Sequence, residues 1–447
     1  MLWVCLERCL NNILNHIYKI YRRVQFIVPL CFLFFLSLNA TTLKIASYNV
    51  ENLFDLQNNG TEYKEYIPHK HNWNKQNFQK KLLNIAEVIC DINADIIALQ
   101  EIENENVLKL LKKRLSKIGC YYNYHAITHK KKSAIQVAIL SNVPIQNTKE
   151  LIVHRRLRYR NILEVKFKLD NRPFYVFVNH WTSKRSDESN RIKSARRLVK
   201  RLKKLPKGSE YVILGDFNND YDEYFRQTPT AINHVLKTTT KEGKFFRINS
   251  LKSNELSHYN LWLELVNYKR WSHNFYGNKQ ALDAIVLPLT LFDGQGLEYI
   301  NDSFSVFKKR YLFHKKGYIF RWELKKGRHK GRGYSDHLAI YALFSTSRAF
   351  KREKEIIRIG SIDELYASSH FPLLLKNVKV IAIEKNKVTI SQKNSKKNIS
   401  IYGVENSMVL KKSYDIMVYG CKNYKGEYEV IDFEIEKRYD TSTSNKE

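Results

Sequence analysis

The sequence predicts a layered α/β domain followed by a small all-β domain. From Leu43 onward, short apolar runs alternate with segments whose apolar residues recur at helical spacing, which is typical of strands alternating with helices. Between Phe344 and Ile359 this pattern gives way to charged residues, and short strand-like runs follow. With 447 residues and a hydrophobic fraction of 43%, the chain can form more than one core, which excludes a disordered protein.

The first forty residues predict a segment that directs export. Two arginines precede an apolar run of 13 residues over 26–38, which matches a secretory signal and is short for a membrane-spanning helix. Ala40 offers a small residue for cleavage, but Leu38 fits the usual cleavage pattern poorly, so an uncleaved anchor is the alternative. We expect 1–40 to be a signal peptide or an N-terminal membrane anchor. The protein would then be periplasmic, secreted or held on the outer face of the inner membrane.

The first domain, which we place at 41–347, is expected to follow α/β order. Its apolar runs are rich in β-branched and aromatic residues, which favours strands. Strands are predicted at 43–50, 94–101, 134–141, 162–169, 173–180, 211–215, 281–287 and 337–344, and helices at 78–89, 106–118 and 189–205.

The second domain, at 348–447, is expected to be a small β-barrel. Four or more short strands separated by turn residues suit a five-stranded barrel of the oligonucleotide/oligosaccharide-binding (OB) kind, although other small barrels would give a similar pattern. Tyrosines in this domain could stack on bases, but packing in the core is the better supported interpretation. These tyrosines are Tyr402, Tyr414, Tyr419, Tyr424 and Tyr428.

The net charge of +32 favours a polyanionic partner such as nucleic acid or an acidic lipid surface. Of this charge, +28 precedes residue 351, so the basic surface belongs to the first domain. The chain is also rich in Lys, Asn, Ile and Tyr throughout, as AT-rich coding produces, and this explains the charge about equally well.

Three cysteines, Cys90, Cys120 and Cys421, lie beyond the N-terminal segment. Their spacing indicates neither a zinc site nor a disulfide framework. One disulfide is allowed by their number, but burial of all three as small hydrophobic residues is better supported.

Polar residues capable of chemistry stand at the ends of the apolar strands, where a sheet can present them on a rigid rim. For any one of them, capping a turn or helix is the ordinary explanation. Six strand ends of this kind in one domain, three of them with two such residues, favour divalent-metal hydrolysis of phosphoesters, because carboxylates, amides and imidazoles are the groups this chemistry uses. The residues are Asn49, Glu101, Asn179, His180, Asp216, Asn218, Asp283, Asp336 and His337.

Six motifs carry a family resemblance. They are SYNVEN at 47–52, ALQE at 98–101, VNHW at 178–181, LGDFNND at 214–220, LDAI at 282–285 and YSDH at 334–337. In this order and spacing they resemble the endonuclease/exonuclease/phosphatase superfamily, especially its DNase I-like, exported bacterial nucleases. The resemblance covers about 43–344 and implies a four-layer α/β sandwich, with two packed sheets flanked by helices.

The resemblance implies a metal site. Glu101 matches the family's metal carboxylate, a hard ligand for Mg²⁺, with Mn²⁺ or Ca²⁺ as alternatives. Asn49 matches the amide that positions this ligand and the metal. Asp336 is a candidate ligand from the second side, and one metal or two is left open.

The resemblance also implies the catalytic groups. Asp216 and Asn218 match the pair that orients or deprotonates the attacking water and holds the phosphate, and their spacing on a strand predicts that they face the same side. His180 and His337 match the two imidazoles around the phosphate. Asp283 matches the carboxylate that fixes the tautomer of His337. Both histidines and Asp216 are candidates for the general base.

Two basic residues after VNHW are candidates for contacts to substrate phosphate. Lys184 and Arg191 match a Ser-Lys and later Arg pattern of the exported subgroup. A solvated basic loop and helix face explain them equally well. The basic run at 325–332 either tracks a phosphate backbone or is a loop that tolerates charge.

These observations predict an exported, Mg²⁺-dependent nuclease that acts on DNA or RNA, associates with a membrane at most through its N-terminal segment and needs no protein partner. A phospholipid or inositol-phosphate phosphodiesterase is the first alternative, and Trp262 and Trp271 would then form an exposed aromatic hairpin. A module that binds nucleic acid or a partner without catalysis is the second. Retention of all the acidic and imidazole positions speaks against it.

Overall fold

A computed structural model describes residues 41–169, 171–253, 255–275, 277–315, 317–346, 358–367, 371–384, 387–402, 408–424 and 426–439. The export segment predicted at 1–40 and the domain boundary predicted after 347 lie outside these residues. The described residues form two separate hydrophobic cores. Among them, no helix has the length and apolar character needed to cross a membrane.

The first sheet contains β1, whose carboxyl-terminal half carries Asn49. β1 runs parallel to β2 and antiparallel to β17, so the first and last long strands of the domain lie next to each other in this sheet. In spatial order the strands are β13 (Glu298–Tyr299), β17 (Ile340–Ser345), β1 (Thr42–Leu53), β2 (Ile96–Ile102), β4 (Gln136–Ser141) and β3 (Tyr124–Ile127), with β14 (Ser305–Val306) also paired to β17.

The second sheet places three of the predicted site residues side by side. β7 and β8 are parallel with His180 opposite Asp216, and β12 is antiparallel to β8 with Asp283 opposite Asp216. The spatial order is β5 (Ile145–Leu151), β6 (Ile162–Leu169), β7 (Arg172–His180), β8 (Glu210–Asp216), β12 (Asp283–Pro288) and β9 (His258–Asn260).

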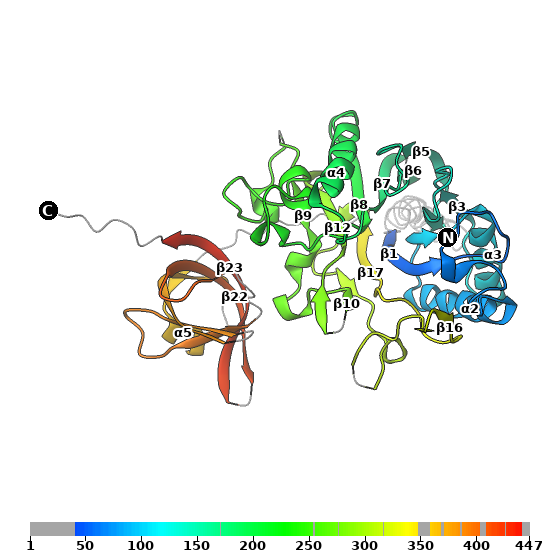
Figure 1. Cartoon of the computed structure of the whole chain (residues 1–447). Coiled ribbons are helices and arrows are strands. Elements are labelled where there is room, and N and C mark those ends of the chain that lie inside the picture. The colour runs from blue at the N-terminus through cyan, green and yellow to red at the C-terminus, as the bar shows by residue number, and fades with distance from the viewer. Residues whose placement is uncertain are drawn as a thin grey trace, which may run out of the picture.

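Helices flank the two sheets, which pack on each other through β1, β2 and β4 of the first and β7 and β8 of the second. Asn74 and Asn104 cap α2 (Lys75–Ile92) and α3 (Glu105–Lys117) by accepting backbone hydrogen bonds, and Asp187 caps α4 (Glu188–Leu202) in the same way. Figure 1 shows α2 and α3 beside the first sheet and α4 beside β7 and β8. The predicted α/β sandwich and its three helices are confirmed.

Short elements connect β8 to β17 and were not predicted. They are η2 (Glu223–Phe225), η3 (Ala231–Val235), η4 (Ile248–Ser250), η5 (Leu261–Glu264), η6 (Asn267–Lys269), β10 (His273–Phe275), β11 (Asn278–Gln280), η7 (Leu289–Leu291), η8 (Arg310–Leu312), β15 (Leu324–Lys325) and β16 (Arg328–His329), while η1 (Lys64–Tyr66) follows β1. The expected exposed hairpin of Trp262 and Trp271 is wrong, because both rings are buried. The Trp262 indole donates to the Asp283 carbonyl at 2.7 Å.

The second core belongs to a closed five-stranded barrel, as predicted. β19 pairs with β20 and β22, and β21 and β23 are parallel, which gives the closed order β19-β20-β21-β23-β22 of an OB-like barrel. Tyr414 is buried in its core, Tyr428 packs against the core, and Tyr402 is exposed. The elements are β18 (Arg358–Gly360), α5 (Ile362–Ala367), β19 (Leu373–Glu384), β20 (Lys387–Ser391), β21 (Ile399–Tyr402), β22 (Ser413–Tyr424) and β23 (Glu427–Tyr439).

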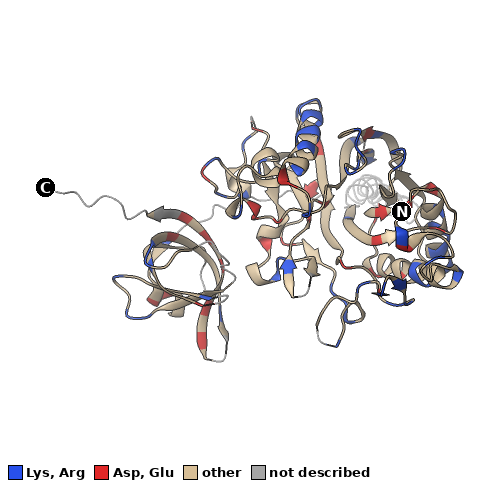
Figure 2. Ribbon diagram, in the orientation of Figure 1, with Lys and Arg blue, Asp and Glu red and all other residues tan. Residues whose placement is uncertain are grey.

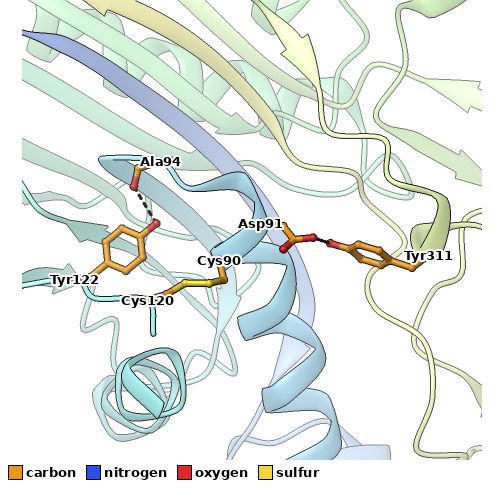
Figure 3. Close-up of a disulfide and its surroundings, with 6 residues drawn as sticks. All are labelled: Cys90, Asp91, Ala94, Cys120, Tyr122 and Tyr311. Atoms are coloured by element: carbon orange, nitrogen blue, oxygen red, sulfur yellow. Dashed lines mark hydrogen bonds between the residues drawn. A yellow bond between two sulfur atoms is a disulfide. The ribbon is translucent and has the colours of Figure 1, made fainter. Parts of the chain in front are cut away.

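Cys90 and Cys120 form a disulfide, so the interpretation of both as buried thiols is wrong. The bridge joins the last turns of α2 to the chain after α3 (Figure 3), and Tyr122 donates to the Ala94 carbonyl next to it at 2.9 Å. The sequence could not reveal the pair because only the packing of α2 beside α3, with their C-terminal ends together, brings the cysteines together. Cys421 is a free, half-buried thiol at the barrel core.

Replacement of Cys90 and Cys120 by serine should lower the free energy of unfolding. The bridge closes a segment of 30 residues, and a loop of this length is worth about 3.6 kcal/mol through restriction of the unfolded chain. Urea unfolding of the oxidised protein and of the double variant measures the difference. Cys421→Ser is the matched control and should leave the stability of the first domain unchanged. If the oxidised wild type and the double serine variant unfold at the same urea concentration, the Cys90–Cys120 disulfide is contradicted.

Candidate active site

Asn49 joins the two sheets at the edge where the predicted residues meet. Its Nδ2 donates to Glu101 Oε1 at 3.2 Å, within the first sheet, and to Asp216 Oδ2 at 3.1 Å, in the second. Its Oδ1 accepts from the Glu51 backbone N–H. Asn49 therefore holds the two carboxylates in place, and in this arrangement it does so as a donor.

Glu101 reaches the site through an unusual backbone conformation. Its φ is +67°, in the left-handed region that only glycine adopts freely, and the pairing of β2 with β4 shifts register at this residue. The bulge turns the carboxylate toward Asn49. Burial raises the pKa of Glu101, and the charge of Asp336 adds to the rise.

Asp216 is the buried carboxylate at the centre of the cluster. Its Oδ1 accepts from the Asn218 N–H at 2.8 Å, and its Oδ2 lies 3.5 Å from His180 Nε2 and 3.9 Å from His337 Nε2. Burial raises the pKa of Asp216 to about 7, although the His337 charge opposes the rise. A carboxyl with this pKa is suited to accept a proton near neutral pH.

His337 is oriented by Asp283 as the family resemblance implies. Its Nδ1 donates to Asp283 Oδ2 at 2.7 Å, and Ser272 Oγ donates to the same oxygen at 2.6 Å. Burial disfavours the charged ring, but Asp283 and then Asp216 overcome this and hold the pKa of His337 well above its usual value. The ring is therefore protonated, with Nε2 directed toward Asp216.

His180 differs from His337 in charge. Burial, Arg160 and His337 lower the pKa of His180 well below its usual value, so the ring is neutral. Its Nδ1 is buried and has no hydrogen-bond partner among the described residues. The site therefore combines one neutral and one protonated imidazole.

Asn218 departs from the prediction that it shares a strand face with Asp216. β8 ends at Asp216, Phe217 N–H donates to the Leu282 carbonyl, and Asn218 turns with φ of +49°. Its Nδ2 donates to the Trp181 carbonyl at 3.2 Å. Asn218 thus lies beside the cluster with its amide already engaged.

Asp336 lies close to His337 and His273, with ligand atoms of the three side chains within 4.8 Å of one another. Its carboxylate is 3.4 Å from Arg321 Nη2 and 3.9 Å from His273 Nε2. Although burial opposes the charge, His337 and Arg321 lower the pKa of Asp336. Arg321 also pairs with Glu51, whose pKa burial raises to about 7.

Lys184 and Arg191 lie in contacts that account for them without a phosphate. Lys184 Nζ lies 2.7 Å from Asp220 and 2.8 Å from Glu223. Arg191 is buried on α4, pairs with Glu188 and donates to three backbone carbonyls. These contacts do not favour the predicted phosphate role for either residue, because their charges are already compensated.

Five residues of the site were not predicted. Ser272 and His273 come from β10 and its approach, in a region without clear periodicity, and only their position before the LDAI motif could have pointed to them. Glu51 lies within the SYNVEN motif and Arg160 lies two residues before a predicted strand, so the sequence could have pointed to both. Arg321 lies in a long basic segment that hides it.

The donor set fits a divalent cation. Asp216 is buried and the Glu101 side chain is 17% exposed, and desolvation raises the pKa of both carboxyls, so their anionic forms lack sufficient positive charge nearby. Oxygen-rich sites of this kind suit hard cations. Ligand atoms of Asp216, Asp283 and His337 lie within 4.8 Å of one another, as do those of His273, Asp336 and His337.

Residues 44–346 match the model of the Endonuclease/Exonuclease/phosphatase family. The chain belongs to this family. It is therefore an enzyme of the metal-dependent phosphodiesterase class, and the recognition from its motifs is confirmed.

Solved structures similar to this family member include D. rerio TDP2 complexed with a single-strand DNA product, at 16% identity over 68% of this chain and 99% of that chain, with a TM-score of 0.43. An endonuclease/exonuclease/phosphatase family protein from Bacteroides thetaiotaomicron is 16% identical over 70% of this chain and 100% of that chain, with a TM-score of 0.42. One from Leptotrichia buccalis C-1013-b is 16% identical over 67% and 98%, with a TM-score of 0.41. None of the curated proteins compared with this sequence matches it.

Mg²⁺ should raise the melting temperature of the protein through Glu101. A ligand that binds only the folded state adds about 2.7 kcal/mol at one hundred times its Kd, and Glu101→Gln should abolish most of this gain. Glu103→Gln is the matched control, because Glu103 is a buried carboxylate of the same region bound to Asp55 and Asn59 outside the cluster. A thermal shift that persists in Glu101→Gln and disappears in Glu103→Gln would refute the metal site.

Proposed function

We propose that the protein is an exported nuclease that hydrolyses DNA or RNA phosphodiester bonds with Mg²⁺ and a water nucleophile. The observation that carries the proposal is a basic hollow of about 380 Å³ beside the catalytic cluster. Its lining includes three cations, Lys132, Arg158 and Arg160, together with the side chains of Tyr63 and Thr182.

The hollow adjoins the cluster through Arg160. This residue donates to the Trp181 carbonyl at 3.2 Å, next to His180, and its charge lowers the pKa of His180. A phosphodiester chain with its scissile phosphate at Asp216 could place the next phosphate among these cations, whereas a single small phosphate would leave them unused. Figure 2 shows Lys and Arg along α4 and on the helices beside the first sheet.

The cluster supplies the groups for in-line hydrolysis. Asp216 accepts a proton from water as the water oxygen bonds to phosphorus. The bond from phosphorus to the leaving oxygen breaks, and the protonated His337 gives its Nε2 proton to that oxygen. Asp283 stabilises the charged imidazole before this transfer, and Asn49 keeps Asp216 aligned.

Glu101, aligned by Asn49, would hold the Mg²⁺ ion, which would supply Lewis-acid polarisation of the phosphate oxygens. Asp336 is the candidate ligand from the second side. Asn49 would position the carboxylate ligands.

The lipid alternative loses its main support. Trp262 is fully buried under Asp283, and Trp271 is buried with Lys308 Nζ 4.0 Å from the centre of its ring, so neither forms a surface hairpin. We therefore retain nucleic acid as the substrate.

The decisive experiment offers the full protein plasmid DNA, RNA, sphingomyelin and inositol phosphates, each with Mg²⁺ or a chelator. Nucleic acid should be cleaved only with the metal. The Lys132→Ala/Arg158→Ala protein should bind DNA with a salt slope lower by about two, one for each lost phosphate contact. Arg196→Ala/Lys200→Ala on α4 removes the same charge elsewhere and should leave the slope closer to wild type. Consumption of lipid or inositol phosphates alone would refute the proposal.

Export is supported by the disulfide as well as by the apolar run at 26–38. Structural disulfides persist in oxidising compartments outside the cytosol. Cell fractionation tests this part of the proposal. The full chain should be recovered outside the cytosol with Cys90 and Cys120 oxidised, and deletion of residues 1–40 should retain it inside with both cysteines reduced. Cytosolic recovery of the full chain would refute export.

A further inference from the structure

The barrel is attached to the first domain through an acidic stripe on β23. Asp432, Glu434 and Glu436 alternate along the strand and so share one face. Each pairs with a cation of the first domain. The pairs are Asp432 with Arg270, Glu434 with Arg247 and Glu436 with Lys244.

Arg270 is the buried member of this interface. Its side chain is 2% exposed, and its Nη2 donates to Asp432 Oδ1 at 2.8 Å. Its Nε donates to the Leu265 carbonyl at 2.7 Å, and its guanidinium lies 5.1 Å from the ring centre of Tyr221, beyond the end of β8. A buried guanidinium needs such a complete set of partners, because desolvation of an unpaired charge is costly.

The segment 262–273, which contains Arg270, also contacts Asp283 and the chain around its partner His337. Trp262 donates to the Asp283 carbonyl, and Ser272 donates to the Asp283 carboxylate. The Ser272 carbonyl accepts from Leu338 N–H at 2.7 Å, and His273 pairs with His337 as an isolated bridge. Segment 262–273 therefore fixes Asp283 and His337 from both sides.

We propose that the barrel is part of the active-site support, with Asp432 as a positioning residue that acts through Arg270 on segment 262–273. The proposal rests on the proposed function, because it concerns the same site. Loss of the Asp432 charge leaves Arg270 buried without its counter-ion, so Arg270 shifts toward water and draws Ser272, two residues away, from Asp283. His337 then loses its orientation, while the basic hollow around Arg160 is unchanged.

The edge of the interface provides the matched control. Lys244 and Glu436 are 49% and 21% exposed, and an exposed pair contributes little because water screens it. Among the residues that the structure describes, no hydrogen bond or ion pair links the Lys244 side chain to segment 262–273, whereas Arg270 donates to the Leu265 carbonyl within it. Glu436→Gln changes the charge of the interface without releasing that segment.

The test compares full-length Asp432→Asn, Asp432→Glu and Glu436→Gln in Mg²⁺-dependent hydrolysis of bis(p-nitrophenyl) phosphate. Asp432→Asn should lower kcat about tenfold to a hundredfold with KM within about twofold, the range expected for catalytic groups displaced by up to about 1 Å. Asp432→Glu, which retains the charge, should recover most of kcat. Glu436→Gln should match the wild type. If Asp432→Asn does not fold, Arg270→Lys gives the same comparison.

Proton NMR provides a reading that does not depend on activity. The low-field N–H resonance of His337, identified by its loss in His337→Gln, should shift or broaden in Asp432→Asn and stay unchanged in Glu436→Gln. Wild-type kcat and resonance in Asp432→Asn would overturn the proposal, as would an effect on KM alone or an equal effect of Glu436→Gln. Failure of the nuclease proposal is separate, because it shows as a wild-type protein that leaves DNA and RNA uncut, while the comparison of the Asp432 and Glu436 variants still stands.

Discussion

The amide of Asn49 is the contact on which the catalytic cluster depends, because it is bonded to carboxylates from both sheets. β1 and β2 supply Asn49 and Glu101, and β8 of the facing sheet supplies Asp216. The two carboxylates keep this separation only while the sheets are packed in their observed register. A core formed mainly of fully buried aliphatic and aromatic side chains resists such sliding, since close-packed interiors deform little. The chemistry at the rim is in this sense a product of the packing below it.

Charge is distributed by depth. Acidic groups are buried at the strand ends, where burial raises the pKa of Asp216 and Glu101. Cations lie around them, in the hollow at Arg160 and beside Asp336 at Arg321. The outer cations attract the anionic phosphodiester, and the inner carboxylates suit a bound divalent metal ion. The same principle, with the signs reversed, joins the barrel to the first domain through Arg270 and Asp432.

The strand-end residues could be predicted from sequence because strand direction and register determine where they lie. Asp216 and Asp283 end or begin continuous apolar runs, so their meeting at one rim follows from the pairing of those runs. Asn218 could not be placed in this way, because its φ of +49° breaks the alternation that the prediction assumed. The partners of Arg191 and the Cys90–Cys120 bridge depend on tertiary contacts between elements that local patterns do not encode. Ser272 was missed for the same reason, since the region around it has no regular period.

The backbone of Glu101 has an evolutionary consequence. A residue other than glycine or asparagine in the left-handed region costs roughly 1–2 kcal/mol, and the Glu101 carboxylate is also largely shielded from water, with 17% of its side chain exposed. Glycine or asparagine would relieve the backbone and remove the buried acid together. Selection for thermal stability alone would therefore favour glycine or asparagine at position 101, and the enzyme would lose this carboxylate. The glutamate at this position therefore marks a place where catalysis and stability oppose each other.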